Sequence, residues 1–461
     1  MKVLMLGWEF PPFISGGLGT ACYGLTRGMS QIGTEVLFVL PKPVDPTHST
    51  HVTILSPQSV VEKAGLACSY ALEGFEHIKF CALQAGVGVS SYHTPEQYEH
   101  ILRRRAQRLR TLQRGGEPAE EIGPEEALET AGVHHKSEPQ GSGKASDYEG
   151  NLFDQVERYA RLAVEIADGQ QFDIIHAHDW MTYRAGIAIA ALSGKPLVVH
   201  IHSTEFDRSG EHVNQMIYDI ERQGMHFAQC VIAVSLLTKN IVVNRYGVPA
   251  DKVKVVYNAI EMNGTPHRNV PLMPIRRDEK LVLFLGRITM QKGPEYFLAA
   301  AKKVLDVMDN VRFIMAGWGD MVRRTIELAA EMGIGHKVLF TGFLRGADVE
   351  RVFRMADLYV MPSVSEPFGI APLEALSNDV PVIISKQSGV SEIINHALKV
   401  DFWDVNEMAN KIIAVLRHRP LHSMLREQGK LEVHRLSWAD SAKHCVEVYE
   451  EVLAPQYASS T

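Results

Sequence analysis

Two cations follow an apolar segment in the second half of the chain. Residues 281–285 read Leu-Val-Leu-Phe-Leu, and Gly286-Arg287 and then Lys292-Gly293 come directly after them. Ligands of open parallel sheets bind outside the carboxyl ends of the strands. A guanidinium fork and an ammonium point charge at such a strand end suit an anion with several oxygens. We therefore predict that Arg287 and Lys292 bind a diphosphate.

Two carboxylates lie further along the chain in the spacing E-x7-E. Glu366 belongs to the run Glu366-Pro367-Phe368-Gly369, and Glu374 follows at the expected start of a helix. Both side chains could face one cleft, although Glu374 alone could equally be a first-turn glutamate that complements the helix dipole. The run 387–392 precedes another helix, and we expect its free amides to be available for phosphate.

A glycine-rich turn follows the first apolar segment of the chain. It reads Ser15-Gly16-Gly17-Leu18-Gly19 and leads into a helix-compatible stretch. Backbone N–H groups can approach an anion at such a turn. The turn does not match G-x-G-x-x-G, so a merely tight connection is the alternative interpretation.

Short β-branched segments alternate with helical segments in both halves, which is typical of parallel sheets built from βαβ units. We therefore predict an α/β fold with two doubly wound domains, at 1–262 and 279–437. The expected strands are 3–6, 36–40, 173–176, 197–201, 231–234 and 253–257 in the first domain, and 281–285, 311–316, 338–340, 358–361 and 382–384 in the second.

Three segments lie outside these two sheets. Residues 261–280 carry several prolines and little periodicity, which favours an interdomain linker. Residues 438–453, within a C-terminal segment 438–461, are amphipathic, and we expect this helix to return to the first domain. Residues 90–150 hold a block of arginines followed by a block of glutamates. They indicate an insertion, either a solvated helical hairpin or a lid or docking surface.

Composition excludes several classes of protein. With 461 residues, 46% hydrophobic and 22% charged, the chain exceeds a single small module and is not disordered. A net charge of −7 provides no general positive field for nucleic acid. The five cysteines form no C-x2-C pair, and no signal-peptide core or transmembrane stretch is present. We therefore expect a cytoplasmic protein.

Together these motifs resemble the retaining nucleotide-sugar glycosyltransferases with two Rossmann-like domains, the GT-B fold. The similarity is to glycogen and starch synthases and to the group-1 glycosyltransferase family, and it covers most of the chain except 90–150. The matching runs are 15–19, His176-Ala177-His178-Asp179-Trp180, 199–205 with His202, Gly286-Arg287, Gln291-Lys292-Gly293, and 366–374.

The resemblance assigns roles to individual residues. It implies that Arg287 and Lys292 hold the donor diphosphate, that Glu374 holds the ribose, and that Glu366 and the amides after Phe368 contact the donor sugar. His202 would face this sugar from the first domain, and Asp179 would border the acceptor. The predicted catalytic residues are therefore His202, Arg287, Lys292 and Glu366, and the predicted donor-binding residues are Gly16, Gly17, Arg287, Lys292, Phe368, Gly369 and Glu374.

The resemblance also implies the substrates: a UDP- or ADP-glucose type of donor, a transferred hexose such as glucose, and a glycan acceptor. Ile14 stands where ADP-glucose-dependent synthases usually have a lysine, so the base of the donor stays open. The sequence contains no D-x-D pair, and we expect no obligatory metal or other cofactor. The alternatives are transfer to a lipid, small sugar or cell-envelope glycan, or a noncatalytic nucleotide-sugar-binding regulator. The oligomeric state is open.

Overall fold

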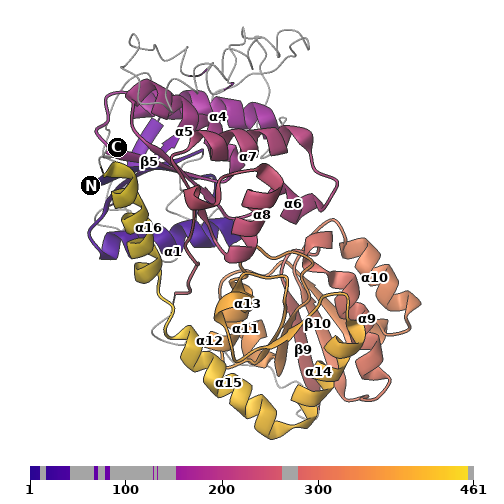
Figure 1. Cartoon of the computed structure of the whole chain (residues 1–461). Helices are drawn as coiled ribbons and strands as arrows, with labels where there is room; N and C mark the ends of the chain where they lie inside the picture. The colour runs from indigo at the N-terminus through magenta and orange to yellow at the C-terminus, as the bar shows by residue number, and fades with distance from the viewer. Residues whose placement is uncertain are drawn as a thin grey trace.

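The computed structural model describes residues 1–10, 17–41, 67–70, 78–83, 128, 132, 152–261 and 279–454. These residues form two sheets, one above the other in Figure 1, with helices on both faces of each sheet. The first sheet has the strand order β3-β4-β2-β1-β5-β6-β7-β8, and the second has the order β11-β10-β9-β12-β13-β14. The predicted fold class, two doubly wound α/β domains, is therefore confirmed.

All neighbouring strands pair in parallel, except β3 and β4, which pair antiparallel. The strands of the first sheet are β1 (Lys2–Leu6), β2 (Glu35–Leu40), β3 (Ala67–Tyr70), β4 (Ile78–Leu83), β5 (Ile174–His178), β6 (Leu197–Ile201), β7 (Cys230–Ala233) and β8 (Val253–Val255). Those of the second are β9 (Lys280–Leu285), β10 (Val311–Ala316), β11 (Val338–Gly342), β12 (Leu358–Met361), β13 (Val382–Ser385) and β14 (Leu398–Val400).

The sheets are covered because their central strands are apolar on both faces, as is usual for parallel strands. Every residue of β5 and β6 is buried. The helices of the first domain are α1 (Gly17–Gln31), α4 (Leu152–Ala167), α5 (Trp180–Ser193), α6 (Glu205–Ser209), α7 (Gln215–Phe227) and α8 (Leu236–Tyr246). Those that follow are α9 (Pro294–Leu305), α10 (Val322–Glu331), α11 (Ala347–Met355), α12 (Ala371–Ser377), α13 (Val390–Ile393), α14 (Val405–Arg417), α15 (Arg419–Val433) and α16 (Trp438–Leu453). None of the described helices is long and apolar enough to cross a membrane.

Each strand expected from the sequence coincides with a strand of the structure to within a few residues, but β3, β4 and β14 were not predicted. The insertion at 90–150 falls outside the described residues apart from Leu128 and Gly132, and so do Gly16 and most of the linker, 262–278. The exact domain boundaries stay a prediction.

The C-terminal helix α16 returns to the first domain and lies beside α1 (Figure 1). The two helices approach closely because α1 presents glycines to Trp438. A Cβ added at Gly28 would lie 2.2 Å from the backbone oxygen of Trp438, and one at Gly24 would lie 2.1 Å from its indole ring. Ser441 of α16 also donates to the backbone oxygen of Tyr257 at 2.7 Å. The expected return of this helix is therefore confirmed.

We predict that Gly28→Ala destabilises the protein by about 1–3 kcal/mol, the usual cost of overpacking. The added methyl group meets backbone of α16, which cannot rotate away. Urea denaturation measures the loss. Gly17→Ala is the control, because a Cβ at Gly17 meets no atom of the described residues within 4 Å. Unchanged or higher stability of Gly28→Ala, as helix propensity alone would give, contradicts this close packing.

Candidate functional site

A cavity of about 430 Å³ lies between the two domains. Its lining residues follow the carboxyl ends of strands from both sheets, as expected for ligand sites of open parallel sheets. Asp179 follows β5 and His202 follows β6 in the first domain, whereas Arg287 follows β9 and Glu366 follows β12 in the second. The other predicted site residues that line it are Gly17, Lys292, Phe368, Gly369 and Glu374.

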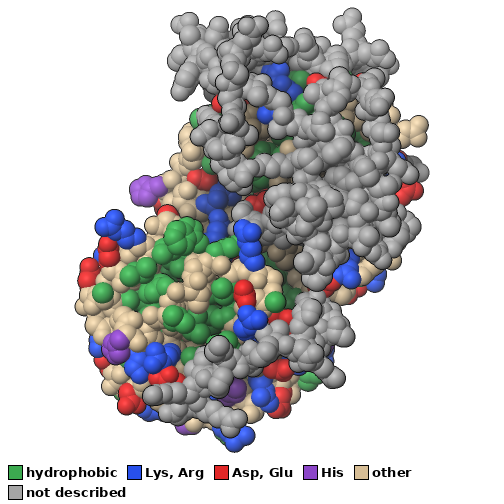
Figure 2. Space-filling model, turned by 180° about the vertical axis from the view of Figure 1, so that it is seen from behind, with side chains coloured by type: hydrophobic (Ala, Val, Ile, Leu, Met, Phe, Trp, Pro, Cys, Tyr) green, Lys and Arg blue, Asp and Glu red, His purple; other side chains and the backbone are tan. Residues whose placement is uncertain are grey.

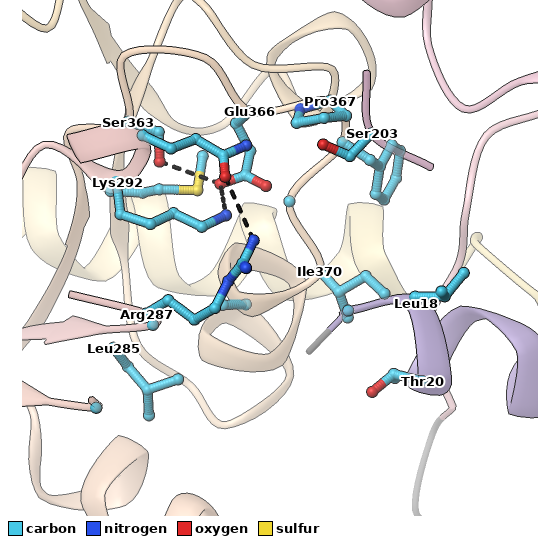
Figure 3. Close-up of a pocket in the computed structure, with 18 of the residues that line it drawn as sticks. Leu18, Thr20, Ser203, Leu285, Arg287, Lys292, Ser363, Glu366, Pro367 and Ile370 are labelled. Atoms are coloured by element: carbon cyan, nitrogen blue, oxygen red, sulfur yellow. Dashed lines mark hydrogen bonds and ion pairs between the residues drawn. The ribbon is translucent and has the colours of Figure 1, made fainter. Parts of the chain in front are cut away.

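Lys292 and Glu366 form an ion pair in the cavity wall (Figure 3). The Lys292 Nζ lies 2.5 Å from Glu366 Oε2, and the Ser363 hydroxyl donates to the same oxygen at 3.1 Å. Arg287 donates from Nη2 to the Gln291 side-chain oxygen at 3.3 Å and points toward the same space. The two predicted cations, which are five positions apart in the chain, therefore line the same part of the cavity.

The turn after β9 places Lys292. Residues Met290–Lys292 form one short 3-10 turn, which ends at Gly293 with φ 65°. Glycine adopts this left-handed conformation without a steric cost. Pro294 then begins α9, a position where its missing N–H is not needed. Gly293 therefore separates the 3-10 turn from α9, and Lys292, the last residue of the turn, pairs with Glu366.

The loop that carries Glu366 is fixed by backbone hydrogen bonds to the loop after β13. Glu366 donates to the Gln387 oxygen at 2.9 Å, Gly389 donates to the Glu366 oxygen at 2.9 Å, and Val390 donates to the Phe368 oxygen at 2.7 Å. The expectation that the amides of 387–392 are free for phosphate is therefore wrong for Gly389 and Val390, which bond the Glu366 loop. It is also wrong for Gln387, Ser391 and Glu392, whose amides donate to Ser385, Ser388 and Gly389.

Glu374 lies in the first turn of α12 and lines the same cavity as Glu366, so the E-x7-E spacing does bring both carboxyls to one cleft. Burial raises the pKa of Glu374 to about 7. No described residue hydrogen-bonds its carboxylate. A group in this state exchanges protons near neutral pH and has acceptor capacity available for a ligand.

On the opposite wall, Asp179 holds the backbone that carries His202. Asp179 Oδ1 accepts from the His202 backbone N–H at 2.7 Å, and the backbone of Ser203 also hydrogen-bonds this carboxyl. Burial is the largest effect on Asp179 and raises its pKa to about 7. Asp179 has φ 57°, uncommon for a residue with a side chain. Asp179, expected at the acceptor, and His202, expected at the donor sugar, are thus hydrogen-bonded to each other in the structure.

His202 belongs to a stack of four histidines on one face of β5 and β6. His176 and His178 alternate along β5, and His200 and His202 continue the pattern on and beyond β6. Burial lowers the pKa of all four, to about 3 for His176 and His202, so the rings are neutral. His178 Nδ1 lies 2.9 Å from His202 Nε2.

Three of these rings bring nitrogen atoms within 4.8 Å of one another, a spacing compatible with a metal ion. However, the His176 and His200 rings stack with an interplanar angle of 9°, and those of His176 and His178 with 27°. Imidazole lone pairs lie in the ring plane, so nearly parallel rings do not direct them at a common point. We therefore interpret the stack as packing that supports His202.

Several residues of the cavity were not predicted from the sequence. Arg208 lines the cavity and donates to Glu205, Glu221 and the Ser203 backbone oxygen at 3.0, 2.6 and 3.0 Å. Its only local signal is the capping box formed by Thr204 and Asp207 at the start of α6. The further lining residues without a predicted role include Glu9, Thr20, Asn258, Gln291, Ser363 and Phe343.

The second domain also exposes apolar side chains at the cavity rim. Trp318, after β10, is 64% exposed, and Phe343, after β11, is 52% exposed, and both line the cavity. Figure 2 shows hydrophobic side chains gathered on the second domain below the first. The cavity therefore has charged side chains in its wall and exposed aromatic side chains at its rim. This arrangement fits a ligand with both phosphate and flat apolar parts.

Family models match three successive parts of the chain. Residues 2–109 match the starch synthase catalytic domain, residues 123–263 match glycosyltransferase family 4, and residues 273–432 match the glycosyl transferases group 1. An uncharacterized glycosyltransferase of Methanocaldococcus jannaschii is 29% identical, over 98% of both chains. A glycogen synthase of Mycobacterium tuberculosis is 22% identical over 86% of this chain and 80% of its own.

The fold has a solved counterpart in the catalytic domain of starch synthase IV from Arabidopsis thaliana, bound to ADP and acarbose. The TM-score is 0.66 at 15% identity, and the match covers 98% of this chain and 99% of the other. At this identity the likeness concerns the fold, whereas the sequence matches concern the family. The chain therefore has the two-domain GT-B fold, and each of its three matched segments is similar to a glycosyltransferase family, with residues 273–432 similar to the glycosyl transferases of group 1.

Proposed function

We propose that the protein transfers a hexose, glucose in the first instance, from a nucleoside-diphosphate sugar to a glycan acceptor, in the manner of glycogen and α-glucan synthases. The observation that carries this proposal is the cavity between the two sheets, where Arg287 and Lys292 lie with Glu366 and Glu374. Similarity to starch and glycogen synthases supports the α-glucan type.

The predicted roles fit the geometry of the cavity. Arg287 and Lys292 supply cationic donors for the diphosphate. Glu374, with unused acceptor capacity, suits the ribose hydroxyls. Glu366, together with Phe368 and Gly369, faces the sugar, and Gly17 at the start of α1 lies across the cavity with His202 and Asp179. Asp179 both borders the acceptor and holds the His202 backbone.

The chemistry is displacement at the anomeric carbon. The bond from this carbon to the diphosphate oxygen breaks, a bond to the acceptor hydroxyl oxygen forms, and the hydroxyl proton passes to the departing phosphate. Arg287 and Lys292 stabilise the charge that develops on this phosphate. We propose retention of configuration by attack on the same face, with no nucleophilic carboxylate. Enclosure of the cavity by both domains would limit hydrolysis of the donor.

The proposal is tested with a panel of nucleotide sugars, first for thermal stabilisation and then for transfer to a glucan, a small sugar and a lipid acceptor. We expect stabilisation by one class of donor and transfer to the glucan, and both should persist in excess chelator. Transfer to another acceptor would favour the alternative substrate class, and stabilisation without turnover would favour a binding regulator. Activity lost in chelator and restored by Mg²⁺ would contradict the metal-free site.

We predict that Lys292→Ala lowers kcat by about 10²–10³, the usual effect of removing one group that stabilises developing negative charge. The measurement is release of nucleoside diphosphate coupled to transfer. Lys302→Ala is the matched control, because this lysine lies exposed on α9 and pairs with Asp306 outside the cavity. A folded Lys292→Ala protein with nearly normal turnover would show that the diphosphate is bound elsewhere.

We predict that affinity for the nucleotide sugar rises with pH through about 7. Glu374 has a raised pKa of about 7, so its carboxyl is protonated below this pH and ionised above it. Ionisation favours acceptance of two ribose hydroxyl bonds, and affinity at pH 8 should exceed that at pH 6 by up to about tenfold. Calorimetry at both pH values measures the ratio. The ratio should fall in Glu374→Gln; an unchanged ratio in this variant would exclude Glu374 as its source.

A further inference from the structure

A carboxylate of the second domain caps the first turn of a helix of the first domain. Glu392, in α13, accepts from the backbone N–H groups of Leu236 and Leu237 at 2.8 Å each. These residues begin α8, which faces the second domain (Figure 1). The Tyr257 hydroxyl donates to the same carboxylate at 2.9 Å. Glu392 therefore joins three donors that all belong to the first domain.

The start of α8 also contacts the loop that carries Glu366. The Ser235 hydroxyl donates to the Pro367 oxygen at 2.6 Å, and the Thr238 hydroxyl approaches the same oxygen at 3.4 Å. Gly389 allows this approach, because a Cβ there would lie 2.3 Å from the Pro367 oxygen and 2.5 Å from the Ser235 Cβ. We call the bonds that Glu392 and Pro367 make to α8 and Tyr257 the α8 contact.

A second contact holds the same loop one residue before Glu366. The Ser365 hydroxyl donates to Asp207 Oδ1 at 2.5 Å. Asp207 is only 1% exposed and is itself fixed, because its other oxygen accepts from the Thr204 backbone and hydroxyl at 2.7 Å each. The first domain therefore holds the residue on each side of Glu366.

These contacts connect the arrangement of the domains to the cavity. Gly389 donates its N–H to the Glu366 oxygen, and Val390 donates to the Phe368 oxygen, so the segment that leads to Glu392 is bonded to the Glu366 loop. The bonds to α8, Tyr257 and Asp207 exist only while the two domains lie together. The Glu366 loop is thus supported by its own domain and by the opposite one.

We infer that Glu392 is a positioning residue: through the α8 contact it places the Glu366 loop for transfer when the two domains are closed. This inference rests on the proposed function of the cavity. A carboxylate on two amides of a helix N-terminus makes charge-assisted bonds and complements the helix dipole. Loss of this placement should impair transfer more than donor binding, since small displacements at a reacting centre cost rate steeply.

The experiment compares Glu392→Ala and Glu392→Gln with a matched control, Glu432→Ala. Glu432 also accepts from two backbone amides, those of Asn395 and His396 at 3.0 Å each, but entirely within the second half of the chain. We expect Glu392→Ala to lower kcat about tenfold or more, with the donor dissociation constant changed less than about threefold. Glu392→Gln should fall between, and Glu432→Ala should keep the wild-type kcat.

Small-angle scattering provides a readout that does not depend on turnover. With nucleotide sugar bound, Glu392→Ala should have a larger radius of gyration than the wild type, because the domains separate more often. Tyr257→Phe removes a single hydroxyl and should change kcat and radius of gyration in the same direction by less. This variant replaces Glu392→Ala in the test if Glu392→Ala does not fold.

Wild-type kcat and radius of gyration in the Glu392 variants, or an equal loss of kcat in Glu432→Ala, would overturn the inference. A wild-type protein that transfers from no donor would instead contradict the proposed function, and the scattering comparison would still decide the role of the α8 contact.

Discussion

The constraint on which this site depends is the meeting of two sets of strand ends. In a parallel sheet all strands end at one edge, and here the carboxyl edges of both sheets border the same cavity. Neither sheet alone assembles the site, because the cations and the E-x7-E carboxylates belong to the second domain and His202 and Asp179 to the first. The transfer that we propose therefore requires the two domains to lie together, which would exclude water from the reacting atoms and strengthen the electrostatic interactions there.

The Glu366 loop takes part in most of the interactions that hold the site. Its carboxylate pairs with Lys292, its backbone is bonded by Gly389 and Val390, and its flanking residues reach Asp207 and Ser235 in the opposite domain. An ion pair of low exposure is costly to desolvate unless further hydrogen bonds support it, and the Ser363 hydroxyl supplies one. The residues of the Glu366 loop therefore both hold the two domains together and line the cavity.

The sequence predicted what is local. Strand ends, helix starts and the types of residue placed there sufficed to predict that Arg287, Lys292, Glu366 and Glu374 lie at one cleft, and the amphipathic period located α16.

The features that the sequence could not predict depend on strand register and on contacts between distant parts of the chain. His178 meets His202 only because β5 and β6 pair with His178 opposite His200. Asp207 and Ser365 are 158 positions apart, and no local pattern relates them. The amides of Gly389 and Val390 were assigned to phosphate because the backbone that uses them lies in another loop. Strands β3, β4 and β14 were also missed.

The most direct test of the account is a crystal structure with a nucleoside-diphosphate hexose bound. We predict that the diphosphate lies within hydrogen-bonding distance of Arg287 and Lys292, the ribose hydroxyls on Glu374, and the hexose between Glu366 and His202. A nucleotide bound in another cavity, or in this one with its diphosphate directed away from both cations, would contradict it.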